Sequence, residues 1–380
     1  MATYYVRLDG NDGNAGTGIA TGQAWATISY ALGASSPVAS GDTVYIAPGV
    51  YRQTSGITLS KSLSSTLTVT GDTAGVVFGL PSGEVRMTTY PSESGASTQT
   101  ALLNITASNV TLNNLTFELG GNSDAYVVNS RGRNHTFYKC VFIHGLPSNN
   151  GGSGALFGTS QNATTTNRVI DSCIFTGNRG VTVQVTTGGF SGTTIKDSLF
   201  INQGYSFYQT TGASQSGTDA SLITNCTFLS SQSSACIRTD DGSASGLTVQ
   251  NNLFIAFSAS GSCLQTGGAS QNTFLIENYN RIIGFAVTRS SVASIGANTT
   301  VNGTQGVDYG SILQGYTMVP FASNRSTSSN ISYGRTANAP TVDMVGTSWT
   351  GGIPDAGSIT YKSLAGALLT HPGMTGGIRG

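Results

Sequence analysis

The sequence predicts an all-β protein built as a parallel β-helix, a solenoid of short strands, and three observations support this. One six-residue pattern ending in phenylalanine returns six times between Val110 and Ile255. Successive phenylalanines are 25 to 33 residues apart, which is the period of a supersecondary repeat with variable loops. The 51 glycines, with abundant Ser, Thr and Asn, suit tight corners and uncharged exposed strand faces. The six pattern-ending residues are Phe117, Phe142, Phe175, Phe200, Phe228 and Phe254.

Each copy of the pattern requires a bend. Apolar or small residues stand at the phenylalanine and at two and five positions before it. A flat strand alternates its faces with period two, so it cannot point all three inward. Five copies carry Asn or Asp three or four positions before the phenylalanine, and these residues tolerate a left-handed backbone. We therefore expect two short strands that meet at Asn114, Asp171, Asp197, Asn225 or Asn251 in these copies.

Stacked coils place equivalent residues on top of one another at about 4.8 Å. The phenylalanines then form an internal aromatic ladder, and the position two residues earlier forms a second column. Stacked Cβ atoms are further apart than a disulfide prefers, so we expect all five cysteines to be unpaired and buried, which favours a reducing compartment. The second column is Leu115, Cys140, Cys173, Ser198, Cys226 and Asn252, and the other cysteines are Cys236 and Cys263.

The amino-terminal region reads as a lid followed by the first coil. Residues 4–12 predict a strand and a turn, and residues 23–32 predict a short amphipathic helix that ends at Gly33. A solenoid needs such a lid because an open end exposes its core and unpaired edge amides. Residues 41–51 then predict a turn, an alternating strand and a Pro-Gly turn.

These opening motifs also carry a resemblance to a known family. Tyr-Tyr-Val at 4–6, Asp-Gly-Asn-Asp at 9–12, Trp-Ala-Thr-Ile at 25–28 and the segment 41–51 occur in this order. They resemble the start of the right-handed parallel β-helix proteins of the pectate-lyase-like superfamily, among them bacteriophage tail-spike and virion surface proteins. The resemblance implies a right-handed coil and extends through the repeats to about residue 283. Residues 339–346 and 354–358 are similar to the closing motif of such proteins.

We divide the chain into three regions on this basis. Residues 1–40 are the amino-terminal strand and capping helix, 41–283 the parallel β-helix, and 284–380 an irregular β-rich region for closing and assembly. Residues 81–100 and 146–165 are polar insertions. The chain starts without a basic and apolar leader and has no apolar run of membrane-spanning length, so we expect neither a signal peptide nor membrane insertion.

Composition restricts the chemistry that the chain can perform. Only 9% of residues are charged, and 17 basic residues balance 17 acidic ones, so a phosphate-binding basic patch and nucleic-acid binding are not expected. Lyases and hydrolases of the resembling fold use clustered carboxylates, sometimes with calcium and a basic residue. The nearest catalytic candidates are Asp219, Arg238, Asp240 and Asp241. The favoured alternative is that Asp-Asp-Gly at 240–242 is only a turn at a coil corner.

The remaining polar candidates have structural explanations. Asp171 and Asp197 read as bend residues, and Trp25 and Trp349 as packing residues. Three histidines, at positions 135, 144 and 371, lie in predicted loops or the tail, and none has metal-ligand spacing. We therefore predict no metal site and no cofactor.

Three functions remain after these considerations. The leading interpretation is a structural or adhesive bacteriophage virion protein, a tail spike, fibre or capsid-surface decoration, with glycan binding as an option. It would be made in the host cytoplasm without a signal peptide. Its expected partners are its own copies in a trimer, other virion proteins and, optionally, cell-surface polysaccharide. The alternatives are an enzyme, namely a polysaccharide lyase or glycoside hydrolase, and a bacterial surface adhesin.

Overall fold

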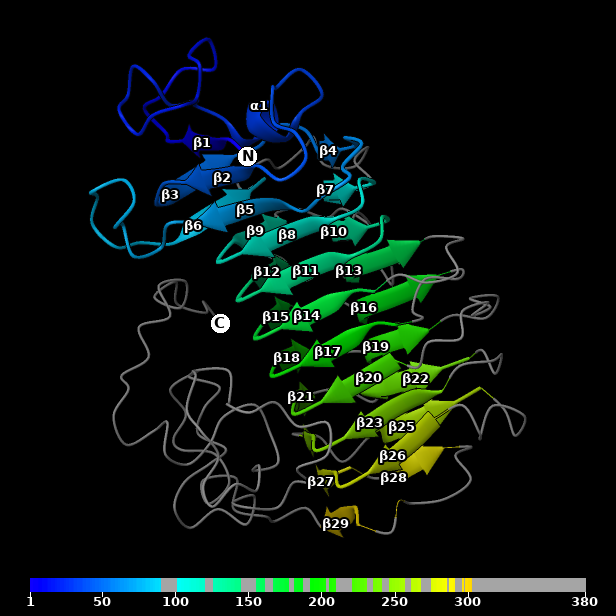
Figure 1. The fold of residues 1–380 in the computed structure, drawn as a ribbon. Helices are drawn as coiled ribbons and strands as arrows, with labels where there is room; N and C mark the ends of the chain where they lie inside the picture. Colours follow the sequence, from blue (N-terminus) through cyan, green and yellow to red (C-terminus); the bar gives the residue numbers. More distant parts are fainter. Residues whose placement is uncertain are drawn as a thin grey trace. The chain divides into compact units, whose positions relative to one another are not determined.

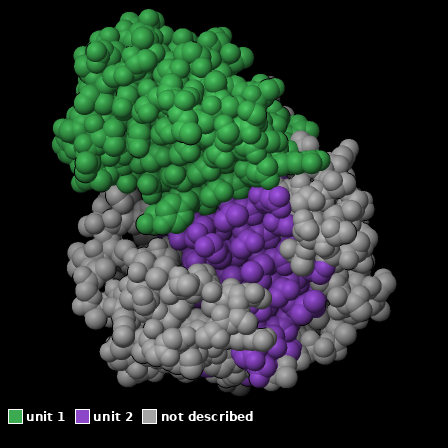
Figure 2. Space-filling view, in the orientation of Figure 1, with its two compact units in different colours: residues 1–159, 369–380 green, residues 160–368 purple. Residues whose placement is uncertain are grey.

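The predicted right-handed parallel β-helix is confirmed, and the described residues form many short strands and one short helix (Figure 1). The computed structural model describes residues 1–89, 101–119, 126–144, 155–160, 167–177, 181–186, 192–202, 205–209, 221–230, 235–240, 246–256, 261–267, 275–285, 287–290, 296 and 298–302. The chain forms two compact units, residues 1–159 with 369–380 and residues 160–368 (Figure 2). Within each unit, successive coils pass through three parallel sheets.

Unit 1 contains the amino-terminal lid and the first coils. Its strands pair in parallel with the equivalent strand of the next coil. The first sheet has the order β1 (Thr3–Val6), β2 (Thr43–Ile46), β5 (Leu67–Gly71), β8 (Val110–Asn113) and β11 (His135–Tyr138). The second is β3 (Gly49–Arg52), β6 (Val85–Thr88), β9 (Thr116–Leu119) and β12 (Val141–His144). The third is β4 (Ile57–Leu59), β7 (Ala101–Ile105), β10 (Tyr126–Ser130) and β13 (Ala155–Ser160).

Unit 2 repeats the same three-sheet coil. The first sheet is β14 (Val169–Asp171), β17 (Thr194–Lys196), β20 (Ser221–Thr224), β23 (Leu247–Gln250) and β26 (Leu275–Asn278). The second is β15 (Ile174–Gly177), β18 (Leu199–Asn202), β21 (Thr227–Ser230), β24 (Leu253–Ala256), β27 (Arg281–Ile283) and β29 (Thr300–Asn302). The third is β16 (Val181–Thr186), β19 (Tyr205–Gln209), β22 (Ile237–Thr239), β25 (Ser262–Thr266) and β28 (Val287–Ser290).

The lid contains a shorter helix than the pattern of residues 23–32 predicted. The helix α1 spans only Ile28–Leu32, and the Thr27 hydroxyl caps it by accepting from the Tyr30 amide. The Asp12 carboxylate binds the amides of residues 26 and 27, which holds the chain before the helix in a non-helical conformation. Trp25 is fully buried, and its ring stacks on Tyr4 at 4.9 Å, which confirms its packing role.

The aromatic ladder is confirmed within both units. In unit 1, Phe117 pairs with Phe142, and the two ring centroids are 5.5 Å apart. In unit 2, Phe175, Phe200, Phe228 and Phe254 are in register, and successive centroids lie 4.6 to 4.8 Å apart. All six rings are at most 1% exposed, so together with the apolar residues beside them they form the interior of the coils.

The bends lie three positions before each ladder residue. Asn114, Asp197, Asn225 and Asn251 have φ between 51° and 58°, as the pattern predicted. The prediction for Asp171 was wrong: Ser172 takes the positive φ of 55°, and Asp171 ends β14 with its carboxylate 2.8 Å from the Lys196 ammonium. In the remaining copy the bend residue is Lys139, with φ 52°, and in the next coil beyond the six copies it is Tyr279, with φ 54°.

The second internal column becomes polar towards the end of unit 2. Asn252 and Asn280 are fully buried. The side-chain oxygen of Asn280 accepts hydrogen bonds from both the backbone N–H and the side-chain amide of Asn252. Asn280 in turn donates to the Glu277 carboxylate, so the column satisfies its own polar groups. All five cysteines are free and buried, which confirms that prediction.

Strands also occur where the sequence suggested none. Within the described parts of the two predicted polar insertions, β6 lies at Val85–Thr88 and β13 at Ala155–Ser160, and each pairs with an adjacent coil. After Ile283, β28 pairs with β25 and β29 pairs with β27, so coil pairing continues to residue 302. Residues 303–380, with Trp349, His371 and both closing motifs, lie outside the described residues. In the described part of the chain, no helix is long and apolar enough to span a membrane.

Candidate functional site

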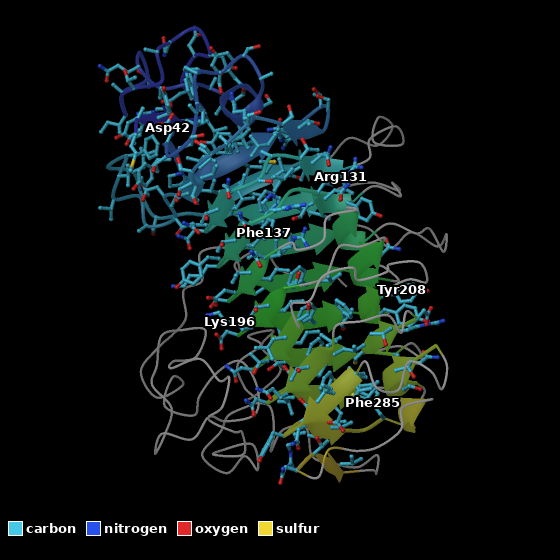
Figure 3. All side chains as sticks on the ribbon, turned by 45° about the vertical axis from the view of Figure 1, so that its right-hand side comes forward. Asp42, Arg131, Phe137, Lys196, Tyr208 and Phe285 are labelled. Atoms are coloured by element: carbon cyan, nitrogen blue, oxygen red, sulfur yellow. The ribbon has the colours of Figure 1, made fainter. Side chains whose placement is uncertain are left out.

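The outer face of the third sheet of unit 2 carries a row of polar side chains. Along the interior of this sheet, Val183, Phe207, Ile237 and Leu264 are in register and at most 1% exposed. Because side chains alternate along a strand, the next residue of each strand points outward. The outward row, also in register, is Gln184 on β16, Tyr208 on β19, Arg238 on β22 and Gln265 on β25. Figure 3 labels Tyr208 in this row.

Arg238 is the centre of a cluster of four side chains. Its Nε donates to Asp240 Oδ1 at 2.8 Å, and its Nη1 donates to the Tyr205 hydroxyl at 2.8 Å. The Tyr208 hydroxyl donates to the other carboxylate oxygen of Asp240, also at 2.8 Å. We call Tyr205, Tyr208, Arg238 and Asp240 the arginine cluster.

The two tyrosine rings hold the guanidinium in place. They stack with their centroids 5.0 Å apart, and the guanidinium carbon of Arg238 lies 5.5 Å from the Tyr205 centroid and 5.2 Å from that of Tyr208. These distances are within the range of cation–π attraction. Arg238 is therefore fixed by an ion pair, a hydrogen bond and two aromatic rings before any ligand arrives.

The cluster presents a cation to the solvent although its formal charge is zero. The Arg238 side chain is 28% exposed, whereas that of Asp240 is 7% exposed. The hydrogen bonds to Asp240 and Tyr205 use the Nε–H and one Nη1–H, so the other N–H groups of Arg238 have no protein partner among the described residues. An anionic ligand at this surface would meet free guanidinium donors before it met the carboxylate.

The protonation states of the cluster follow from these contacts. The hydrogen bond to Asp240 raises the pKa of Arg238, so the guanidinium stays charged. Burial, followed by the hydrogen bond to Asp240, raises the pKa of Tyr208 to about 12, so this phenol stays neutral at physiological pH. Neither group is a proton acceptor near neutrality. The cluster can orient and stabilise negative charge, and a base would have to come from elsewhere.

The structure unites only part of the predicted catalytic set. Arg238 and Asp240 are in contact, whereas Asp219 and Asp241 lie outside the described residues. Asp240 does follow a strand, but its carboxylate also binds Arg238 and Tyr208, which a simple turn does not explain. Tyr205 and Tyr208 were not among the residues predicted from the sequence. The signal that could have found them is their position one coil before Arg238 in a strand-forming stretch.

Two further candidates for chemistry in the described chain are occupied by structural contacts. Arg86 is enclosed by the carboxylates of Glu84 at 2.7 Å and Glu118 at 3.1 Å. The loop assignment of His135 was wrong: it lies fully buried in β11, between the Ser130 hydroxyl and the Ala107 carbonyl. His144 ends β12. Among the described residues, His, Cys, Asp and Glu form no group of three or more that could hold a metal ion.

Several solved structures are similar to this chain. Pectate lyase Pel9A matches at TM-score 0.49 and 14% identity, over 95% of this chain and 96% of that one. Pectin methylesterase from Aspergillus niger matches at TM-score 0.39 and 14% identity, over 81% and 88%. Pectin methylesterase PemA from Erwinia chrysanthemi matches at 0.42 and 11%, over 80% and 91%. No protein-family model and no curated protein sequence matches the chain.

The fold of the chain is a parallel β-helix. At these identities the likeness shows the fold alone. The leading interpretation, a structural or adhesive bacteriophage virion protein, finds no support among the structures named above, which are a pectate lyase and two pectin methylesterases, and it is withdrawn. The resemblance to virion proteins came from motifs of the lid and first coil, which belong to the β-helix architecture and carry no information on function.

Proposed function

We propose that this protein is a polysaccharide-active enzyme, a lyase in preference to a hydrolase, whose substrate carries carboxylate groups. The observation that supports the proposal is the arginine cluster, in which a fixed guanidinium with unused donors lies on the outer face of a sheet. Guanidinium groups bind carboxylates through paired, charge-assisted hydrogen bonds.

The chemistry of a lyase suits a fixed cation of this kind. In β-elimination, a base removes the proton on the carbon beside the sugar carboxylate, and negative charge develops on that carboxylate. The electron pair then forms a carbon–carbon double bond, the glycosidic carbon–oxygen bond breaks, and the leaving oxygen takes a proton. A preorganised donor aimed at the developing charge stabilises this transition state. We assign that role to Arg238, while Asp240 and the two tyrosines position it.

A glycoside hydrolase is less well supported by the same cluster. Hydrolysis requires two carboxyl groups on either side of the scissile bond, one of which must be protonated to act as the acid. Both oxygens of Asp240 accept hydrogen bonds, one from the Arg238 guanidinium and the other from the Tyr208 hydroxyl, so the carboxylate is directed at its protein partners. Asp240 is therefore suited to positioning Arg238 and not to protonating a leaving group.

The test is product formation from a panel of soluble acidic and neutral polysaccharides. A lyase releases reducing ends together with the ultraviolet absorbance of an unsaturated sugar, whereas a hydrolase releases reducing ends alone. Arg238→Gln should lower the rate by roughly 100- to 1000-fold, as loss of one preorganised donor does. Tyr138→Phe, an exposed tyrosine at the end of β11, is the control that should retain the rate. Absence of product from every polymer, or an unchanged rate in Arg238→Gln, would contradict the proposal.

A further inference from the structure

The neighbours of Arg238 in the outward row are uncharged. Gln265 lies beside it on β25, and Tyr208 and then Gln184 lie on the other side, on β19 and β16. Within the described residues of this row, Arg238 is the single cation. Adjacent strands are about 4.8 Å apart, which is similar to the advance of one sugar residue along an extended polysaccharide. A chain lying across these strands would thus place successive sugars over successive members of the row.

Two neighbouring members of the row, Arg238 and Gln265, offer different chemistries to a sugar. Arg238 offers charged donors that match a carboxylate, whereas the Gln265 amide offers one neutral acceptor and two donors, which match hydroxyl or amide substituents. No hydrogen bond of the Gln265 side chain occurs in the described chain, so its amide is available to a ligand. In the outward row as the structure describes it, a second carboxylate over Gln265 would meet no cation, and it would leave water without charge compensation.

We infer that the site selects an acidic polysaccharide in which a carboxylated sugar is flanked by uncharged sugars, in preference to a homopolymer of uronic acid. The inference rests on the proposed function and names its substrate class. Arg238 binds the carboxylate of the acidic sugar. Gln265 is a specificity-determining residue that hydrogen-bonds the adjoining uncharged sugar. The low charge of the whole chain, 9% of residues with no net charge, agrees with a ligand held by one ion pair and several neutral hydrogen bonds.

Equilibrium binding to three soluble polymers tests this selectivity. Hyaluronan alternates uronic acid with a neutral amino sugar, polygalacturonate is a uronic acid homopolymer, and dextran is neutral. The wild-type protein should bind hyaluronan about tenfold more tightly than either of the other two, because it loses one charge-assisted contact on dextran and meets an unpaired charge on polygalacturonate. Affinity electrophoresis or calorimetry gives the three dissociation constants.

A charge-adding variant makes the test specific to Gln265. Gln265→Lys should raise the affinity for polygalacturonate about two- to fivefold, which is the contribution of an exposed ion pair, and should reduce the preference for hyaluronan. Ile276→Lys, at a 55% exposed position on β26 of the first sheet, adds the same charge to the same unit and should leave the preference unchanged.

The possible outcomes separate this inference from the proposed function. Equal or tighter binding of polygalacturonate by the wild-type protein, or the same shift in both lysine variants, would overturn the inference. If the protein bound polygalacturonate as tightly as hyaluronan and cleaved it in an Arg238-dependent reaction, the proposed function would stand and the inference about selectivity would fail. If no acidic polymer were bound or cleaved, both would fail.

Discussion

In each repeated copy, a residue with left-handed backbone forms the bend between the first strand and the second. The residue type at that position determines how much backbone strain the coil carries. Asparagine and aspartate adopt this conformation at low cost, which is why Asn114, Asp197, Asn225 and Asn251 could be predicted. Lys139 and Ser172 could not, because neither residue type prefers a positive φ. Their conformation is imposed by the pairing of the flanking strands, a tertiary effect.

Replacement of Lys139 by Asn should therefore stabilise the protein. Lys139→Asn relieves a left-handed conformation that costs about 1–2 kcal/mol in ordinary residues, against the loss of an exposed cation–π contact with Tyr138. We expect a net gain of about 0.5 kcal/mol in the free energy of unfolding by chemical denaturation. Thr136→Asn, within β11, should instead destabilise the protein, since Asn is disfavoured in strands. A loss of stability in Lys139→Asn would refute the strain argument.

The titration of Tyr208 reports on the arginine cluster. Its pKa is raised to about 12, so the neutral phenol is favoured in the folded protein. The associated stability is present below the ordinary tyrosine pKa of about 10 and is lost as the pH rises through about 12. Tyr208→Phe should remove this contribution to the pH dependence of unfolding.

Asp240→Asn tests how much the contact with Asp240 adds to burial in raising the pKa of Tyr208. Removing the carboxylate removes the hydrogen bond and the negative charge, so the pKa of Tyr208 should fall. Phenolate absorbance, measured as a difference from the corresponding Tyr208→Phe protein, follows this one group. An unchanged midpoint in Asp240→Asn would show that the contact between Tyr208 and Asp240 is absent in solution.

At the scale of the elements, the ladder strands could be predicted well and the connecting elements less well. The register of the phenylalanines could be predicted because the same six-residue pattern precedes each of them. The strands β6 and β13 lack that pattern, and their backbone is ordered by pairing with adjacent coils. The helix α1 is shorter than its amphipathic pattern because the Asp12 carboxylate competes for the preceding amides.

Truncation of one ladder ring measures how far a coil depends on its neighbours. Phe200 lies between Phe175 and Phe228, with centroid distances of 4.8 and 4.7 Å, and is 1% exposed. Phe200→Ala should lower the free energy of unfolding by about 3–5 kcal/mol, the range for a buried aromatic. Tyr138→Ala removes a ring that is 37% exposed and should cost much less. Similar losses in the two variants would contradict the ladder register.

For the whole molecule, the cysteines provide a check on the folded core. All five are free and buried, and burial raises the pKa of the Cys226 thiol, so the native protein should react slowly with an alkylating reagent. After unfolding without reductant, mass spectrometry should find five labels. A smaller number of labels would show that a disulfide is present and would refute the prediction that all five cysteines are unpaired. The homotrimer expected from the sequence stays a prediction, for which light scattering is the measurement.

The candidate site was only half predictable because it depends on contacts between coils. Arg238 and Asp240 stand two residues apart in the sequence and were recognised together, whereas Tyr205 and Tyr208 reach them from the preceding coil. The distance along the chain between two coils varies with loop length, so neither stacking nor hydrogen bonding across coils can be read from spacing alone.

The central claim is that Arg238 binds the carboxylate of an acidic polysaccharide, and a crystal structure with a bound oligosaccharide tests it most directly. Crystals soaked with a hyaluronan oligosaccharide should show a sugar carboxylate within hydrogen-bond distance of the free Arg238 donors, with the adjoining neutral sugar beside Gln265. Arg238→Gln crystals treated in the same way should show no ligand there. An oligosaccharide bound at another face of the protein, or bound equally in the variant, would contradict the claim.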